Sequence, residues 1–155
     1  MIDLAIVTAP NPDIRALIGE LEADLAQFYP PEQRHGLPIS AIFQPHIRFF
    51  VAHHNNVPVG CGGVALFSDF AEVKRMYVRP AARGQGAAPA ILAKLAATAR
   101  DAGLPMLRLE TGTEQHAAIK LYERAGFVRC TAFGDYATMP ANAISTSVFM
   151  EKPLG

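Results

Sequence analysis

The segment Glu72–Leu92, EVKRMYVRPAARGQGAAPAIL, constrains the fold more than any other part of the chain. A run with β-strand character ends at Arg79-Pro80, and a short loop with two glycines then leads directly into residues with helical periodicity. Pro89 fits the first turn of that helix, because a proline there lacks only an N–H that has no acceptor within the helix. The segment therefore predicts a strand, a glycine loop and a helix in immediate succession.

This glycine loop has the chemistry of a site for a bound diphosphate. The start of a helix presents N–H groups without partners and the positive end of the helix dipole, and both attract anions. Small residues let phosphate oxygens approach the backbone, although the same glycines would also suit a merely tight connection. The fingerprints GxGxxG and Gly-Lys-Ser/Thr are both absent, which argues against a dinucleotide fold and a P-loop. The residues predicted to hold the diphosphate are Arg83, Gly84, Gln85, Gly86, Ala87 and Ala88.

The rest of the chain supplies the elements of one mixed α/β domain over residues 1–155. Apolar residues at three- and four-residue spacing predict helices over about 11–28, 87–103 and 115–125. Apolar, β-branched runs predict strands at about 2–8, 47–52, 57–67, 72–78, 106–110, 127–131 and 145–150. Short turns, including Asn55-Asn56, join the second, third and fourth strands into an antiparallel meander. The expected order is β-α-β-β-β-α-β-α-β-β.

The first predicted helix carries an apolar stripe that runs as far as Leu25 and Phe28. Glu20, Glu22 and Asp24 fall away from that stripe. These carboxylates have two interpretations: they recruit a cationic substrate, or they form an ordinary solvated helix face. The second interpretation is the simpler one.

Composition excludes several classes of protein. Half of the residues are hydrophobic, which argues against a disordered chain, and 14 basic residues balance 14 acidic ones. A net charge of zero provides no long-range field for nucleic acid or an anionic membrane. No run approaches the roughly 20 apolar residues of a membrane span, and no basic region precedes the first apolar run as in a signal peptide. Cys61 and Cys130 are expected to be buried thiols in a reducing cytoplasm, and no His or Cys spacing suggests a metal.

Two motifs resemble those of the GCN5-related N-acetyltransferase (GNAT) superfamily. Arg83-Gly84-Gln85-Gly86-Ala87-Ala88 is similar to its motif A, Gln/Arg-x-x-Gly-x-Gly/Ala. The stretch Ala118–Phe127, AIKLYERAGF, resembles its motif B, of the form A-x-x-L-Y-x-x-x-G-F. The motifs occur in the family's order with one predicted strand between them. The resemblance covers residues 2 to about 152, and it implies the GNAT fold, a mostly antiparallel sheet flanked by helices.

The resemblance implies acetyl-CoA as cosubstrate, no metal, and attack by an amine of a small molecule or of a peptide or protein terminus. Main-chain groups at Met76, Tyr77 and Val78 would pair with the pantetheine arm. Many members have Asn at the start of the motif B helix, where this chain has Gln115, so a pantetheine contact there is an open expectation. A homodimer is a further open expectation from the resemblance, because dimers are common in the family.

Three residues are candidates for the catalytic groups. Tyr122 matches the motif B tyrosine that many members place near the thioester sulfur as general acid, although it also fits a core position. Glu72, on the strand before the glycine loop, matches the glutamate base of some members, and Glu110 is the competing base. Tyr29, Arg34 and His35 lie in the loop where the resemblance implies the acceptor pocket, although ordinary loop residues are the simpler interpretation of all three. A non-catalytic acyl-CoA-binding module is the alternative to an enzyme.

Overall fold

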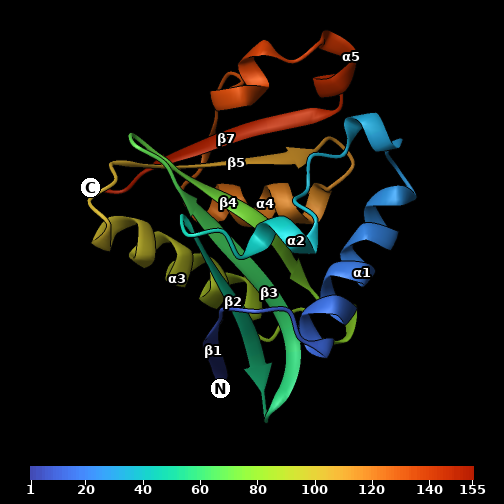
Figure 1. The fold of residues 1–155 in the computed structure, drawn as a ribbon, viewed down its shortest axis with the longest axis vertical. Helices are drawn as coiled ribbons and strands as arrows, with labels where there is room; N and C mark the ends of the chain where they lie inside the picture. Colours follow the sequence, from blue (N-terminus) through green and yellow to red (C-terminus); the bar gives the residue numbers. More distant parts are fainter.

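The computed structural model of the protein describes all residues, 1–155, as one seven-stranded sheet flanked by helices (Figure 1). The strand order is β1-β2-β3-β4-β5-β7-β6. The strands are β1 (Ile2–Val7), β2 (Ile47–His54), β3 (Val57–Leu66), β4 (Ala71–Val78), β5 (Met106–Gly112), β6 (Val128–Arg129) and β7 (Ser147–Pro153). The longer helices are α1 (Pro12–Ala26), α3 (Ala87–Asp101) and α4 (His116–Arg124). The connections contain the short helices η1 (Pro31–Gln33), α2 (Ile39–Ile42), η2 (Pro80–Ala82), η3 (Gly134–Thr138) and α5 (Ala141–Ile144).

The first four strands form the antiparallel part of the sheet. Asn55 and Asn56 make the β2–β3 turn with φ of 51° and 63°, the left-handed conformation that Asn tolerates better than other residues with a side chain. Asn11 caps α1, because its side chain accepts a hydrogen bond from the Ile14 backbone N–H at 2.9 Å. The predicted meander and the predicted helix start are both confirmed.

Two hydrophobic clusters lie on opposite faces of the sheet. One joins α3 and α4 to the sheet, and it includes the whole stripe predicted for α3: Ile91, Leu92, Leu95, Ala96 and Ala99. The other joins α1 and α2 to the sheet through residues such as Ile14, Leu17, Phe49 and Tyr77. A third cluster, formed by Phe70, Phe133, Tyr136 and Phe149, holds the η3 segment against the end of the sheet.

Strands β4 and β5 diverge shortly after they meet. They pair in parallel only at Ala71 with Leu107 and at Glu72 with Arg108. Beyond this point β5 pairs with β7 along its whole length, while β4 stays paired with β3. The edge of β4 that faces β5 is therefore without a strand partner from Val73 to Val78, and a crevice opens between the two strands.

A bulge in β4 coincides with this crevice. Arg75 and Met76 together oppose Gly62, between the pairs Cys61–Tyr77 and Gly63–Lys74. Arg75 has a φ of 52°, a conformation that costs a residue with a side chain about 1 kcal/mol or more. Its buried side chain forms an ion pair with Glu22 of α1, and this interaction offsets part of that cost.

Two expectations from the sequence are wrong in detail. The strand expected over Phe127–Thr131 is reduced to Val128–Arg129, because the chain then turns so that Phe133 can pack into the third cluster. Phe28 is 53% exposed instead of lying on the buried stripe of α1, because the helix ends at Ala26 and the side chain leaves its face. No helix is both long and apolar enough to cross a membrane.

Candidate active site

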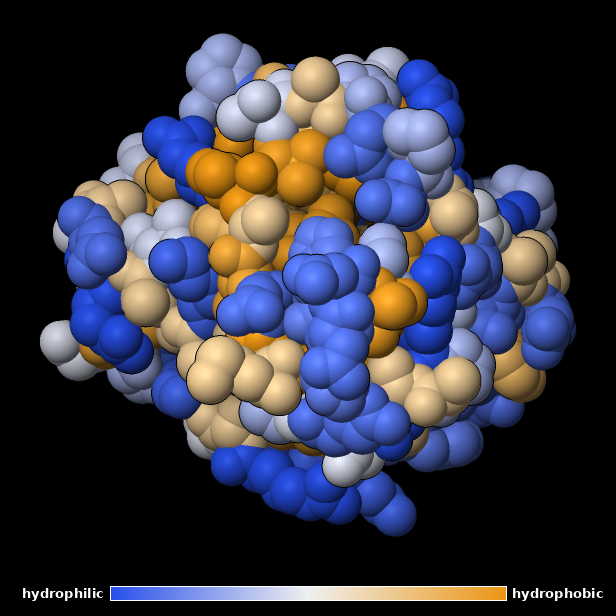
Figure 2. Space-filling model, turned by 90° about the horizontal axis from the view of Figure 1, so that it is seen from below, coloured by the Kyte–Doolittle hydropathy of each residue, from blue (hydrophilic) through white to orange (hydrophobic).

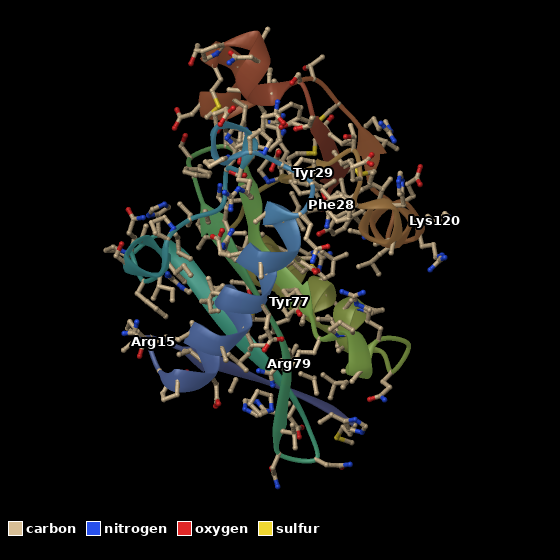
Figure 3. All side chains as sticks on the ribbon, turned by 90° about the vertical axis from the view of Figure 1, so that its right-hand side faces the viewer. Arg15, Phe28, Tyr29, Tyr77, Arg79 and Lys120 are labelled. Atoms are coloured by element: carbon tan, nitrogen blue, oxygen red, sulfur yellow. The ribbon has the colours of Figure 1, made fainter.

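A cavity of about 130 Å³ lies where β4 and β5 separate. The end of α1, the loop after it, both strands and the start of α4 contribute to its walls. Figure 3 shows Tyr29, just beyond α1, close to α4, and its hydroxyl donates to Gln115 Oε1 at 3.3 Å. Three predicted catalytic residues line this cavity together: Glu72, Glu110 and Tyr122. The structure therefore brings together groups that lie up to 50 positions apart in the chain.

Tyr122 projects from α4 toward the crevice. It is buried among core residues, with its ring 5.7 Å from that of Phe127, yet its hydroxyl makes no hydrogen bond to another group of the chain. Burial, with a smaller contribution from the nearby Glu110 carboxylate, raises the pKa of Tyr122 to about 12. The phenol therefore keeps its proton at neutral pH and has an unused donor at the cavity wall.

Glu72 lies on β4 where the two strands part, and it is 4% exposed. One of its oxygens, Oε2, accepts a hydrogen bond from Tyr136 Oη at 2.7 Å and forms an ion pair with Lys74 Nζ at 2.9 Å. The other oxygen, Oε1, takes no part in these contacts, which both involve Oε2. Because Glu72 lines the cavity, its Oε1 is available to accept a proton or a hydrogen bond there.

Tyr136 is a site residue that sequence reasoning missed. It comes from η3, in a loop segment without periodicity, and only the contact with Glu72, 64 positions away, reveals its place. Burial and the neighbouring Glu72 carboxylate raise the pKa of Tyr136, so its hydroxyl remains a donor to that carboxylate. The structure also places Lys74 inside the site, beside Tyr136.

Glu110 faces the same cavity from β5. Ser147 Oγ of β7 donates to Glu110 Oε2 at 2.7 Å. Burial raises the pKa of Glu110, and the hydrogen bond from Ser147 opposes part of that rise. A carboxyl with a raised pKa is closer to the range of a useful proton acceptor near neutral pH, so Glu110 stays a candidate beside Glu72.

A second cavity, of about 610 Å³, lies on the other side of Glu72. It is bounded by the loop before β2, the β3–β4 turn and the η3 segment. Five residues line both cavities: His35, Gly36, Glu72, Lys74 and Tyr136. The predicted acceptor loop thus contributes to both cavities. His35 lines both of them, whereas Tyr29 and Arg34 line the first cavity alone.

The glycine loop precedes α3 as predicted. Gly84 and Gly86 have φ of 81° and 89°, and Gly86 is the N-cap of α3 without a side-chain hydrogen bond. A Cβ at either position would meet no atom within 4 Å, so the loop faces open space. Gln85 Oε1 lies 3.0 Å from Nδ1 of His54, which ties the loop to the β2–β3 turn. Figure 2 shows the molecule from the end nearest the N-terminus, where apolar side chains form a patch among polar ones.

Arg83 lies at the mouth of this loop with a half-exposed side chain. Its Nε donates to the Val78 carbonyl at 3.3 Å, and its guanidinium lies 4.0 Å from Asp24. Met76 lines the first cavity, whereas the Tyr77 side chain points to α1, where its hydroxyl donates to Glu20 at 3.2 Å. Apart from Gln115, at the N-cap of α4, the residues predicted to bind the cofactor lie on one continuous stretch of β4, the loop and the start of α3.

The acidic side of α1 is not simply a solvated face, as the simpler interpretation had it. Glu20 pairs with Arg79 at 3.0 Å, and Figure 3 labels the position of Arg79. Glu22 pairs with Arg75 and, at 3.5 Å, with Arg34. These pairs hold α1 against β4 and against the loop that follows α1. The carboxylates are used within the protein, so the structure also gives no support to their recruiting a cation.

Comparison with known proteins places the chain in a family. The sequence model of the acetyltransferase (GNAT) family matches residues 17–127. An IAA acetyltransferase of Azospirillum brasilense is 42% identical over 140 residues, which cover 89% of this chain and 88% of that protein. The chain therefore belongs to the GNAT acetyltransferase family.

Solved structures agree with this assignment. A structure named as an acyl-CoA N-acyltransferase from Klebsiella pneumoniae has a TM-score of 0.80 and 35% identity, and the match covers 100% of this chain and 99% of that one. A structure named as a streptothricin acetyltransferase from Bacillus anthracis, in complex with acetyl coenzyme A, has a TM-score of 0.61 at 23% identity, over 74% of this chain and 66% of that one. This second likeness is one of fold.

The predicted fold and class of activity are confirmed by these findings. The protein is an N-acetyltransferase with a GNAT fold, so the enzyme and not the purely binding module is the interpretation that the comparisons support. The particular acceptor and the roles of individual residues are separate questions, which depend on the geometry of the two cavities.

Proposed function

We propose that the protein transfers an acetyl group to a primary amine by direct attack in a ternary complex, inside the crevice between β4 and β5. The observation that carries this proposal is the position of Glu72, which lines both cavities. Its contacts with Tyr136 and Lys74 involve Oε2, which leaves Oε1 for a substrate. An acetyl donor in the first cavity and an amine from the second would meet at this carboxylate. The acceptor is an amine of a small molecule or of a peptide or protein terminus.

The residues around the crevice fit a coenzyme A ester. The free edge of β4 offers main-chain groups at Met76, Tyr77 and Val78 for the amides of the pantetheine arm. The loop from Arg83 to Ala88 offers the open N-terminus of α3 to the diphosphate. Arg83 would exchange its contact with Asp24 for the phosphate oxygens, because the pair at 4.0 Å is long and half-exposed. The thioester supplies the acyl group and a thiol leaving group.

Glu72 is the proposed base. A free amine has a pKa of about 10, so most of it carries a proton at neutral pH and cannot attack. Oε1 of Glu72 would accept that proton directly or through a water, while Tyr136 and Lys74 hold the carboxylate by Oε2. Glu110 is the competing base, and it would serve the same purpose from the β5 side of the first cavity.

Tyr122 is the proposed acid. Its raised pKa keeps the phenol protonated, and its hydroxyl has no competing partner in the protein. A proton passed from Tyr122 Oη to the departing sulfur would prevent a thiolate from accumulating in a buried site. Gln115, whose amide oxygen accepts a hydrogen bond from Tyr29, would hold the pantetheine arm at the start of α4 through its amide nitrogen.

The proposal is tested by following free thiol release from acetyl-CoA over a panel of primary amines. We expect turnover that depends on the amine, and we expect Glu72→Gln and Tyr122→Phe to lower kcat while leaving acetyl-CoA affinity close to that of the unaltered protein. Thiol release that is independent of any amine would contradict transfer to an acceptor. Normal kcat in both folded variants would contradict the assigned roles.

A further inference from the structure

The second cavity has an aromatic wall. Phe67 is 39% exposed and packs on the buried Phe70, with ring centroids 5.0 Å apart. The ring centroids of Phe70 and Phe133 are 5.5 Å apart, and those of Phe133 and Tyr136 are 5.3 Å apart. All four side chains line the cavity, and Leu37, Ile47 and Met139 add aliphatic surface. This row of rings runs from the half-exposed Phe67 to Tyr136, which holds Glu72.

The charges around this cavity are mainly negative. Asp69 and Asp135 are exposed residues of its lining, and Glu72 is its buried carboxylate. Lys74 is the single Lys or Arg in the lining, and its ammonium group is already shared between Glu72 and Tyr136. A protonated amine would be attracted along this path, whereas a carboxylate would face three acidic groups.

No other cation is placed to bind a carboxylate in the cavity. Arg108 stacks over Phe70 and Phe133, lies outside the lining and pairs with Glu151. His35 is held by the Ala143 carbonyl at 2.7 Å, and His46 packs on Phe67. An amino acid or another zwitterion would therefore lose the hydration of its carboxylate without gaining a partner.

From these observations we propose that the acceptor is a primary amine on an aromatic or bulky apolar skeleton that carries no carboxylate. This inference rests on the function proposed above. The volume of about 610 Å³ suits a small organic molecule. The skeleton packs along Phe67, Phe70 and Phe133, and the amine reaches Glu72 Oε1 next to the thioester. A peptide fits less well, because its main-chain polar groups would lie against aromatic rings.

A matched set of amines tests this class. The probes are 2-phenylethylamine, L-phenylalanine, which adds a carboxylate to the same skeleton, and ethanolamine, which removes the ring. We expect kcat/KM for 2-phenylethylamine to exceed that for either of the others by about tenfold or more, a factor that corresponds to about 1.4 kcal/mol. Equal or better turnover of L-phenylalanine, or of a short peptide, would overturn the inference while leaving acetyl transfer intact. No turnover with any amine would overturn the proposed function, and the inference with it.

Two variants locate the effect in the second cavity. Phe67→Ala removes a half-exposed ring and should raise KM for 2-phenylethylamine by about fivefold, with KM for acetyl-CoA unchanged. Asp69→Asn should raise the same KM by about two- to fivefold, less at high salt, as expected for an exposed charge. The control is Phe28→Ala, because Phe28 is also a half-exposed aromatic but lines neither cavity. Equal effects of Phe67→Ala and Phe28→Ala on KM would contradict the placement.

Discussion

The two ends of the β4–β5 crevice are built in different ways. The proposed cofactor end comes from a single stretch, in which β4, the loop at Arg83–Gly86 and the start of α3 follow one another along the chain. The acceptor end comes from the loop before β2, the β3–β4 turn and the η3 segment. It is held together by contacts between distant residues, such as Tyr136 with Glu72 and His35 with the Ala143 carbonyl.

This difference suggests why recognition of the coenzyme A ester needs few particular side chains, whereas recognition of the acceptor depends on them. Main-chain groups of a strand and a helix start recognise features that every coenzyme A ester has, and they need few particular side chains. The proposed acceptor end would recognise its ligand with side chains from loops, so its specificity would depend on which rings and charges those loops carry. The following predictions separate the two ends, from the largest effect to the smallest.

Tyr122→Phe should have the largest effect, because it removes the proposed proton donor and keeps the ring that packs on Phe127. We expect kcat to fall by roughly 10²–10⁴-fold, with the free energy of unfolding changed by no more than about 1 kcal/mol. Steady-state kinetics at saturating acetyl-CoA and thermal denaturation measure the two quantities. Glu123→Gln on the exposed face of the same helix is the control. A folded Tyr122→Phe protein with an unchanged chemical step would make Tyr122 a core residue only.

Glu72→Gln should lower kcat by about 10²-fold or more, because an amide cannot accept the proton of the amine. The loss should be greatest at acidic pH, where free amine is scarcest. Calorimetry should find coenzyme A affinity close to normal, since the glycine loop is untouched. If Glu110→Gln gives this phenotype and Glu72→Gln does not, the base lies on β5. If neither variant does, the amine loses its proton to water before it binds.

Gly86→Glu should weaken coenzyme A binding by about tenfold or more, because it places a negative charge at the start of α3, where the diphosphate is proposed to bind. The substitution also strains the backbone, since φ at Gly86 is 89°. Gly103→Glu is a matched control, because Gly103 has a φ of 79° and equally open surroundings at the other end of α3. If both variants bind coenzyme A equally well, as measured by calorimetry, the diphosphate does not lie on this loop.

Glu110→Gln should have the smallest effect, on the pH dependence of stability. Burial raises the pKa of Glu110, so the folded state binds its proton more tightly than the unfolded state does. The carboxyl therefore stabilises the fold below its ordinary pKa, and this contribution is lost as pH rises through the raised value. Melting temperatures should show that Glu110→Gln gains stability relative to the unaltered protein from pH 4 toward pH 7. A difference that does not change with pH would contradict the raised pKa.

The sequence predicts most of the cofactor end and little of the acceptor end. The strand, loop and helix around Gly84 and Gly86 leave periodic and conformational signals in adjacent residues, so they can be recognised without a structure. The role of Tyr136 leaves no such signal, because it depends on where η3 folds onto the sheet. The acidic residues of α1 show the same limit. Their spacing reveals an outward face, but not that Arg75 and Arg79 of the neighbouring strand pair with it.

The central claim is that both substrates meet in the crevice and that the acetyl group passes directly between them. No thiol is placed to carry the acetyl group there, since neither cysteine lines either of the two cavities and burial raises the pKa of Cys61 to about 12. The most direct test is to mix the protein with acetyl-CoA alone and measure its mass, together with initial rates at varied concentrations of both substrates. We expect an unmodified protein and intersecting double-reciprocal lines. An acetylated protein that passes its acetyl group to the amine, with parallel lines, would contradict direct transfer.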